Sequence, residues 1–148
     1  MKRLLFIIPI LGILIYAFSS NKPAVVSKEG INFLEGTWYD ALKQSSEENK
    51  LIFLDASTSW CGHCKKMKRK AFSDKTVGAY FNANFINLTI DAEKGEGIAL
   101  ARKYGVNSYP TLIIIDKNEK IILYTEGYMN ADKLLGMGQE ALKKQNNF

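Results

Sequence analysis

The chain has 148 residues, a length that fits one domain with a short additional segment. Its residues are 47% hydrophobic and 24% charged, so it can build an apolar core and does not have the composition of a disordered protein. The net charge of +5 is modest, and Lys2 and Arg3 of the N-terminal segment supply two of these charges. The charge therefore does not by itself indicate a nucleic-acid partner, and we expect none.

The N-terminal segment has the composition of a targeting sequence. A basic start precedes an apolar run over residues 4–18, and small and polar residues follow this run. This is the layout of an export signal, with Ala17 and Ser19 at the small-residue positions of a cleavage site. The run is shorter than the ~20 apolar residues of a typical membrane helix. We expect residues 1–20 to be a signal peptide or, alternatively, an N-terminal membrane anchor. Either one would place the domain in the periplasm or at the outer face of the cytoplasmic membrane, where disulfides persist.

Residues 21–30 have the composition of a linker, and residues 31–148 have the pattern of one folded domain. Apolar periodicity, helix caps and turn residues predict the elements of this domain. In chain order the first five are a short strand over 31–33, a helix over 36–46 with Thr37 as its cap, a strand over 51–55, a helix from Cys61, and a helix capped by Ser73 or Asp74. The other five are a strand over 85–91, a helix over 96–104 ended by Gly105, a strand over 111–116, its hairpin partner over 121–125, and a helix capped by Asn130.

The order of these elements indicates the fold class. LIFLD (51–55) and TLIIID (111–116) are continuous apolar runs, as expected for central strands that are buried on both faces. Strands that alternate with helices imply parallel crossovers, and the closing hairpin adds an antiparallel edge. We therefore expect an α/β fold with a mixed central sheet of four or five strands and helices on both faces.

Both cysteines of the chain, Cys61 and Cys64, lie in STSWCGHCKK, between a predicted strand and a predicted helix. A structural zinc site needs four ligands, whereas the chain offers two cysteines and one histidine, His63. A c-type haem anchor is excluded, because Lys65 stands where histidine would have to follow the second cysteine. A structural disulfide remains an alternative, although so short a loop would restrain the unfolded chain very little.

The position of the cysteine pair favours redox chemistry over these alternatives. Cys61 would lie at a helix N-terminus, where unpaired backbone N–H groups and the helix dipole stabilise a thiolate. Cys64, one turn further on, would lie on the buried face of the same helix. We therefore expect Cys61 to be accessible and to attack disulfides, and Cys64 to resolve the mixed disulfide. No cofactor and no metal are expected, because the electrons would reside in the two sulfur atoms.

Gly62 and His63, between the cysteines, are expected to tune this redox couple. Positive potential near Cys61 would stabilise its thiolate, favour the reduced form and make the pair a stronger oxidant. His63 could instead be an exposed residue with no such role. The basic residues that follow could be a solvated helix face, or they could help to recruit acidic partners: Lys65, Lys66, Lys68, Arg69 and Lys70.

Two longer motifs carry a resemblance to a known family. LIFLDASTSWCGHCK (51–65) resembles the strand, loop and helix start of the thioredoxin superfamily, and KYGVNSYPTLIIID (103–116) resembles its second hallmark. CGHC and YPT are similar to the sites of protein disulfide isomerases. KAFSDKTV (70–77) and TEGYMNADKL (125–134) resemble the C-terminal domain of bacterial thiol:disulfide interchange proteins, which pass electrons outward. The resemblance covers residues 31–142 and implies a thioredoxin-like three-layer fold.

The resemblance also implies roles for individual residues. Pro110 would be the cis-proline of the family and would face the cysteines, whereas the residues alone favour an ordinary trans proline at a strand start. Asp55 would be the buried acid that moves the proton of Cys64, and its burial would raise its pKa. Alternatively, Asp55 could simply cap the loop at a strand end. Trp60 and Tyr109 would form an apolar docking surface together with Pro110.

The chain departs from the family pattern at Asn87, where thioredoxins have a lysine near the buried acid. Asp55 would therefore lack that charge partner. Arg69 stands where thioredoxins have a helix-kinking proline, so we expect a straighter helix there.

Together these features predict an exported thiol–disulfide oxidoreductase that exchanges disulfides with protein substrates and with an upstream thiol–disulfide electron donor or acceptor. Its site suggests a redox potential suited to oxidation or isomerisation, although the direction of electron flow stays open. A chaperone-like module or a structural domain of an envelope complex, in which the disulfide is incidental, remains the alternative. We expect contact with a membrane only through the N-terminal segment.

Overall fold

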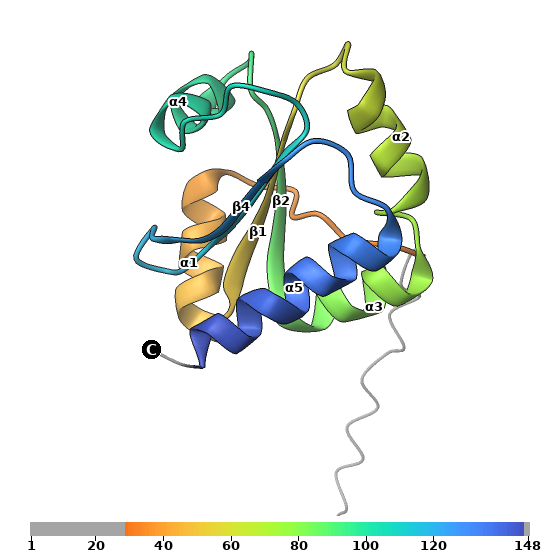
Figure 1. Cartoon of the computed structure of the whole chain (residues 1–148). Coiled ribbons are helices and arrows are strands. Elements are labelled where there is room, and N and C mark those ends of the chain that lie inside the picture. Colours follow the sequence, from red (N-terminus) through yellow and green to blue (C-terminus); the bar gives the residue numbers. More distant parts are fainter. Residues whose placement is uncertain (1–28, 147–148) are drawn as a thin grey trace, which may run out of the picture.

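The computed structural model describes residues 29–146, so the predictions for residues 1–20 and for most of the linker lie outside the described part. Figure 1 shows a central sheet with helices on both sides. The elements are α1 (Trp38–Glu48), β1 (Leu51–Ser57), α2 (Gly62–Lys70), α3 (Lys75–Asn84), β2 (Phe85–Asp91), α4 (Glu96–Lys103), β3 (Thr111–Ile115), β4 (Ile121–Glu126) and α5 (Ala131–Gln145).

The sheet has four strands in the order β2-β1-β3-β4. β1 and β2 are parallel, whereas β3 is antiparallel to both β1 and β4. The predicted mixed sheet is therefore confirmed, with the parallel pair at one side and the closing hairpin at the other. All seven residues of β1 are buried, as its apolar sequence predicts for a central strand.

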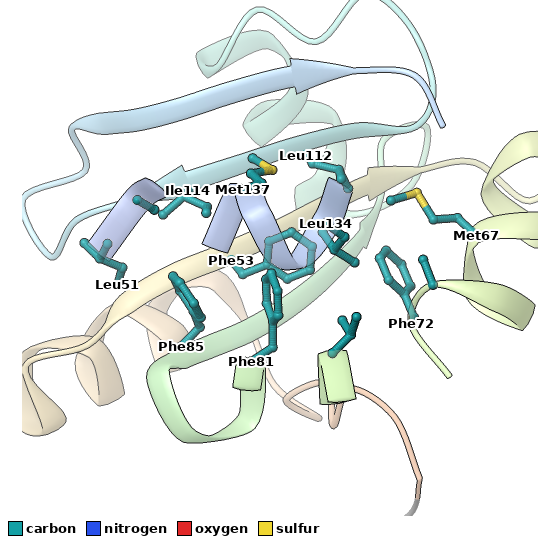
Figure 2. Close-up of a cluster of buried hydrophobic side chains, with 13 residues drawn as sticks. Leu51, Phe53, Met67, Phe72, Phe81, Phe85, Leu112, Ile114, Leu134 and Met137 are labelled. Atoms are coloured by element: carbon teal, nitrogen blue, oxygen red, sulfur yellow. The ribbon is translucent and has the colours of Figure 1, made fainter. Parts of the chain in front are cut away.

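Side chains that alternate along the strands build two cores, one on each face of the sheet. On one face, α2, α3 and α5 pack over a cluster that includes Phe53, Phe81 and Leu134 (Figure 2). On the other face, α1 and α4 cover a cluster that includes Trp38 and Ile113. This arrangement confirms the three-layer fold. It also places the odd-numbered side chains of β1, and with them Asp55, on the side of α2.

The helices begin where the cap residues predict. Thr37 caps α1 and forms a reciprocal capping box with Asp40. Asp74, one of the two residues proposed, caps α3 through two backbone N–H groups, and Asn130 caps α5. Gly105 has a φ of 66°, a conformation that favours glycine after a helix end.

The predicted strand over residues 31–33 is wrong. This segment is extended, but its backbone bonds mainly to groups other than a neighbouring strand. The N–H of Asn32 donates to Oδ1 of Asn82 over 2.8 Å, and its carbonyl accepts Nδ2 of Asn87 over 3.3 Å. Leu34 donates its N–H to the carbonyl of Asn87 over 2.8 Å, as a single strand-like bond. Amide side chains thus take the place of a regular ladder.

Within residues 29–146, every helix is too short or too polar to span a lipid bilayer.

Candidate functional site

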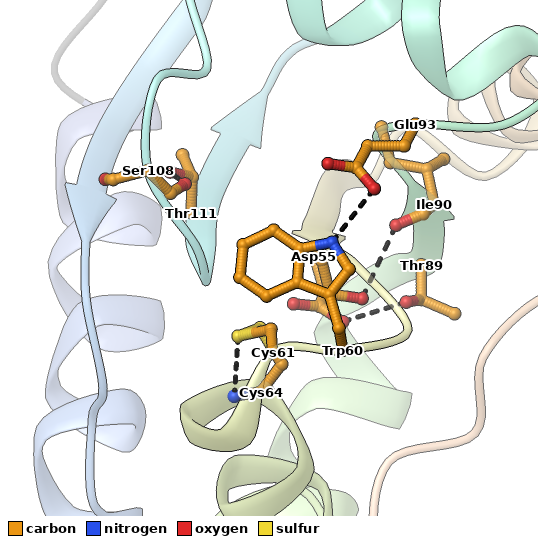
Figure 3. The surroundings of a disulfide bond; sticks show 10 residues. Asp55, Trp60, Cys61, Cys64, Thr89, Ile90, Glu93, Ser108 and Thr111 are labelled. Carbon is orange, nitrogen blue, oxygen red and sulfur yellow. Dashed lines mark hydrogen bonds between the residues drawn. A yellow bond between two sulfur atoms is a disulfide. The ribbon is translucent and has the colours of Figure 1, made fainter.

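Cys61 and Cys64 lie at the start of α2 and are joined in a disulfide (Figure 3). Cys61 is the N-cap of this helix, and its Sγ accepts the backbone N–H of Cys64 over 3.1 Å. The sequence places Cys61 at this position, and the structure confirms it. The backbone N–H of Cys64, in the first turn of α2, therefore points toward Cys61 Sγ, where it favours a negative charge.

The accessibility predicted for Cys61 is not seen in this oxidised form, since only 4% of the residue is exposed, against 2% for Cys64. The reason is that Cys61 Sγ is turned inward, toward the N–H and the sulfur of Cys64. Its neighbours on both sides, Trp60 and Gly62, are exposed, and so is His63. Cys61 is therefore a buried residue that is flanked in the sequence by exposed ones.

Asp55 is buried near the end of β1, with 1% of its surface exposed. It pairs with Thr89 of the neighbouring strand β2, and the Thr89 hydroxyl donates to Asp55 Oδ2 over 2.8 Å (Figure 3). Burial raises the pKa of Asp55 to about 6, while the hydrogen bond from Thr89 and the charge of Lys68 act in the opposite direction. This carboxyl group therefore changes its protonation state close to neutral pH.

Trp60 and Tyr109 come together beside the disulfide, from segments that are far apart in the sequence. Their rings meet edge to face, with centroids 5.9 Å apart. The indole Nε1 of Trp60 donates to Glu93 over 2.9 Å, which orients a ring that is 64% exposed (Figure 3). The Tyr109–Pro110 peptide is cis, as the family resemblance implies. The sequence thus identifies both aromatic residues of this surface but not Glu93.

The sequence reasoning also misses Thr89 and Lys68, the two residues that act on Asp55. The parallel register of β1 and β2 could have indicated Thr89, because it places this residue directly opposite Asp55. Asn87 bonds to Asn32 and Asn82 through its amide group, so its side chain is engaged away from Asp55. Among the described residues, no group of three or more His, Cys, Asp or Glu side chains is arranged to hold a metal ion.

Comparison with known proteins identifies the family to which this chain belongs. The family model described as "Thioredoxin-like domain" matches residues 38–142. Thioredoxin H4 of Arabidopsis thaliana is 30% identical over 106 residues, which are 72% of this chain and 76% of that protein. The thiol:disulfide interchange protein DsbD of Campylobacter jejuni is 29% identical over 111 residues, which are 74% of this chain. This chain spans 19% of the length of that DsbD.

Solved structures extend the comparison. The solution structure of a putative disulphide-isomerase from Bacteroides thetaiotaomicron is 40% identical, with a TM-score of 0.69 over 79% of this chain and 97% of that one. The oxidised C-terminal domain of DsbD from Neisseria meningitidis shares the fold at 20% identity, with a TM-score of 0.60 over 76% of this chain and 99% of that one. This chain belongs to the thioredoxin-like family, and it has the CxxC disulfide of the family's thiol–disulfide oxidoreductases.

Proposed function

We propose that this chain is an exported enzyme that exchanges disulfides with protein substrates through Cys61 and Cys64. One observation carries the proposal: the disulfide lies at the N-terminus of α2, and an acid with a raised pKa is buried on the same face of the sheet. A helix N-terminus stabilises a thiolate, and a carboxyl group that titrates near neutrality can accept and return a proton.

In the reducing direction, the Cys61 thiolate attacks one sulfur of a substrate disulfide, and the other substrate sulfur leaves as a thiolate. Cys64 then loses its proton to Asp55 and attacks Cys61 Sγ. This step forms the Cys61–Cys64 disulfide and releases the second substrate sulfur. Two electrons pass from the pair to the substrate, and oxidation of a substrate is the same sequence in reverse.

The proposed docking site for the substrate consists of Trp60, which is exposed, and Tyr109, which is half-buried; Pro110, predicted to belong to this surface, is buried. It presents exposed aromatic area next to the disulfide, and the bond from Trp60 to Glu93 holds the indole ring in place. Because Cys61 is 4% exposed in the disulfide form, an incoming sulfur would reach it only after neighbouring side chains move. Gly62 and His63 would tune the potential from the first turn of α2.

Two further parts of the proposal rest on the sequence. Export, to the periplasm or the outer face of the cytoplasmic membrane, is supported by the composition of residues 1–20. Residues 31–148 would form the catalytic domain, and an upstream thiol–disulfide protein would donate or accept its electrons. The similarity to a putative disulphide-isomerase supports a role in oxidation or isomerisation.

The central test compares wild type, Cys61→Ser and Cys64→Ser with insulin as the substrate. We expect wild type to reduce insulin in the presence of dithiothreitol, and Cys61→Ser to reach only the uncatalysed rate. Cys64→Ser should accumulate a mixed disulfide through Cys61, visible as a larger band on a non-reducing gel. If all three proteins suppress insulin aggregation equally and none accelerates reduction, the chaperone-like alternative is correct.

A further inference from the structure

A cleft of about 330 Å³ opens between α2, β2 and the segment that precedes α1. Its polar lining comes from Glu29, Lys68, Ser73 and Thr89, and Ile31 and Phe33 are among its apolar lining. Since one molecule of liquid water takes up about 30 Å³, the cleft has room for several water molecules. It is open to solvent and lies on the face of the sheet that carries Asp55.

Thr89 connects this cleft to the buried carboxyl group. It lines the cleft, and its hydroxyl donates to Asp55 Oδ2 over 2.8 Å. Asp55 itself is almost completely buried, so Thr89 is its polar contact toward the solvent in the cleft. A hydroxyl group both donates and accepts hydrogen bonds, which allows it to pass a proton from one neighbour to another.

Lys68 brings a positive charge to the same cleft. It lies on α2, one turn after Cys64, and its charge favours the ionised form of Asp55. Glu29 also lines the cleft, and Cys64, on the same helix as Lys68, is held in the disulfide. β3, the other strand that pairs with β1, has the apolar residue Leu112 in register with Asp55. Lys68 is therefore the cation that acts on this carboxyl group.

We propose that the cleft is the proton route to Asp55, with Thr89 as the relay and Lys68 as the residue that supplies the positive charge. This inference rests on the proposed function, because only a working cysteine pair needs such a route. The charge partner that thioredoxins carry on the strand, at the position of Asn87, is thus supplied here by the helix. Thr89 and Lys68 are positioning residues, since they act on the cysteines through Asp55.

The proton balance of this route is simple. Cys64 gives its proton to Asp55 as it becomes a thiolate. Once Asp55 is protonated, the Thr89 hydroxyl turns its hydrogen from Asp55 Oδ2 to a water molecule in the cleft. It then accepts the proton of Asp55 on Oγ1 as it releases its own hydrogen to that water. One proton leaves the site, Thr89 is unchanged, and Asp55 is again in its ionised form, which the charge of Lys68 favours.

The test of Lys68 uses Lys68→Met, with Lys66→Met as the matched control. Lys66 is on the same helix but lies over the ring of Tyr128, 4.6 Å from its centroid. We expect Lys68→Met to raise the pKa of Asp55, measured by carbon NMR of the labelled carboxyl group in the oxidised protein, by about 0.5 pH units or more. Lys66→Met should leave it at the wild-type value. Equal pKa values in both variants would overturn the role of Lys68.

The test of Thr89 uses Thr89→Val and Thr89→Ser, with a small model disulfide so that protein docking does not contribute. Thr89→Val should slow the release of mixed disulfide about tenfold, because the relay hydroxyl is lost. It should also shift the pH profile upward, because the hydrogen bond that lowers the pKa of Asp55 is lost with it. Thr89→Ser should restore both the rate and the profile, which a purely structural role for the threonine methyl group would not predict. A wild-type rate and profile in Thr89→Val would overturn the route.

These outcomes are separate from failure of the proposed function. If wild type reduces the substrate no faster than Cys61→Ser, the proposed function is wrong, and the proposed proton route is wrong with it. If wild type is active but Lys68→Met and Thr89→Val keep its pH behaviour, the route alone is wrong. Circular dichroism and thermal unfolding of each variant establish that it is folded before its rates are compared.

Discussion

The backbone N–H of Cys64 donates to Sγ of Cys61 over 3.1 Å, so the first turn of α2 already provides a donor to the sulfur that would carry the negative charge. The same geometry in the reduced protein would stabilise a Cys61 thiolate, because the thiolate is a stronger acceptor than the thiol. Cys64 is one turn further into the helix and is buried. The two sulfur atoms should therefore react very differently.

We predict that iodoacetamide at pH 7 modifies Cys61 of the reduced protein about tenfold faster than it modifies N-acetylcysteine, since a larger fraction of Cys61 is ionised. Cys64 should react more slowly than the free thiol. Mass spectrometry of digested samples taken over time measures both rates. The Cys64→Ser variant serves as the control, because it leaves Cys61 as the only thiol. A Cys61 rate no faster than that of the free thiol would contradict the proposed mechanism.

Asp55 should make the stability of the oxidised protein depend on pH. Its pKa is raised from 3.8 to about 6, so the folded state binds a proton between these values while the unfolded state does not. The free energy of unfolding contributed by this group therefore falls as the pH rises from about 4 to about 6. At ~1.4 kcal/mol for each unit, the loss is about 3 kcal/mol.

Asp55→Asn removes this titration while it keeps an oxygen that can accept from Thr89. We expect wild type and the variant to have similar free energies of unfolding near pH 4, with the variant more stable by about 3 kcal/mol at pH 7. Urea unfolding of both oxidised proteins at several pH values measures the difference. A difference that is constant across this range would show that Asp55 has an ordinary pKa.

Trp60 should matter for protein substrates and not for small disulfides. It is 64% exposed and packs edge to face on Tyr109, so it offers apolar area that a bound polypeptide could cover. We expect Trp60→Ala to lower kcat/KM with a protein substrate roughly tenfold, the loss typical of a central aromatic contact. The rate with a small model disulfide should change less than about twofold by the same reasoning.

Tyr39→Ala is the matched control for this experiment. Tyr39 is 73% exposed and lies on α1, on the opposite face of the sheet from α2. It should leave both rates at the wild-type level. Equal losses with the two kinds of substrate in Trp60→Ala would indicate a role in the chemistry of the disulfide instead of docking.

His63 is expected to raise the redox potential of the pair through its positive potential near Cys61. We predict that His63→Gln shifts the potential by about 30 mV toward more negative values, because the reduced form loses about 1.4 kcal/mol of stabilisation. Equilibration with glutathione at neutral pH measures the shift. Lys70→Gln, at the far end of α2, is the control and should have the wild-type potential.

Local sequence signals predict the fold well wherever interactions between residues close in the sequence determine the structure. The apolar run at 51–55 predicts a buried strand, and Thr37 and Asn130 cap the helices that they precede. Cys61 is identified as a helix-start residue for the same reason, since it lies between a strand and a helical pattern. Each of these features is determined by residues that are close to one another in the sequence.

The features that the sequence leaves undetermined depend on contacts between distant segments. Thr89 reaches Asp55 across 34 residues, and Glu93 reaches Trp60 across 33. The predicted strand over 31–33 is wrong for the same reason, because the backbone there bonds to side-chain amides that are 50 and 55 residues away in the sequence. The cis peptide before Pro110 was expected only from the family resemblance, since an X-Pro bond is trans by default.

The irregular segment from Ile31 to Leu34 has a consequence for the solubility of the fold. β2 is the outermost strand on its side of the sheet, and this segment lies along it and takes up a carbonyl of Asn87. A bare strand edge is a template onto which another chain can add its own strand. Leu34 occupies one carbonyl of that edge, and the side-chain amides of Asn82 and Asn87 bond the backbone of Asn32, so part of the β2 edge is no longer open to another chain.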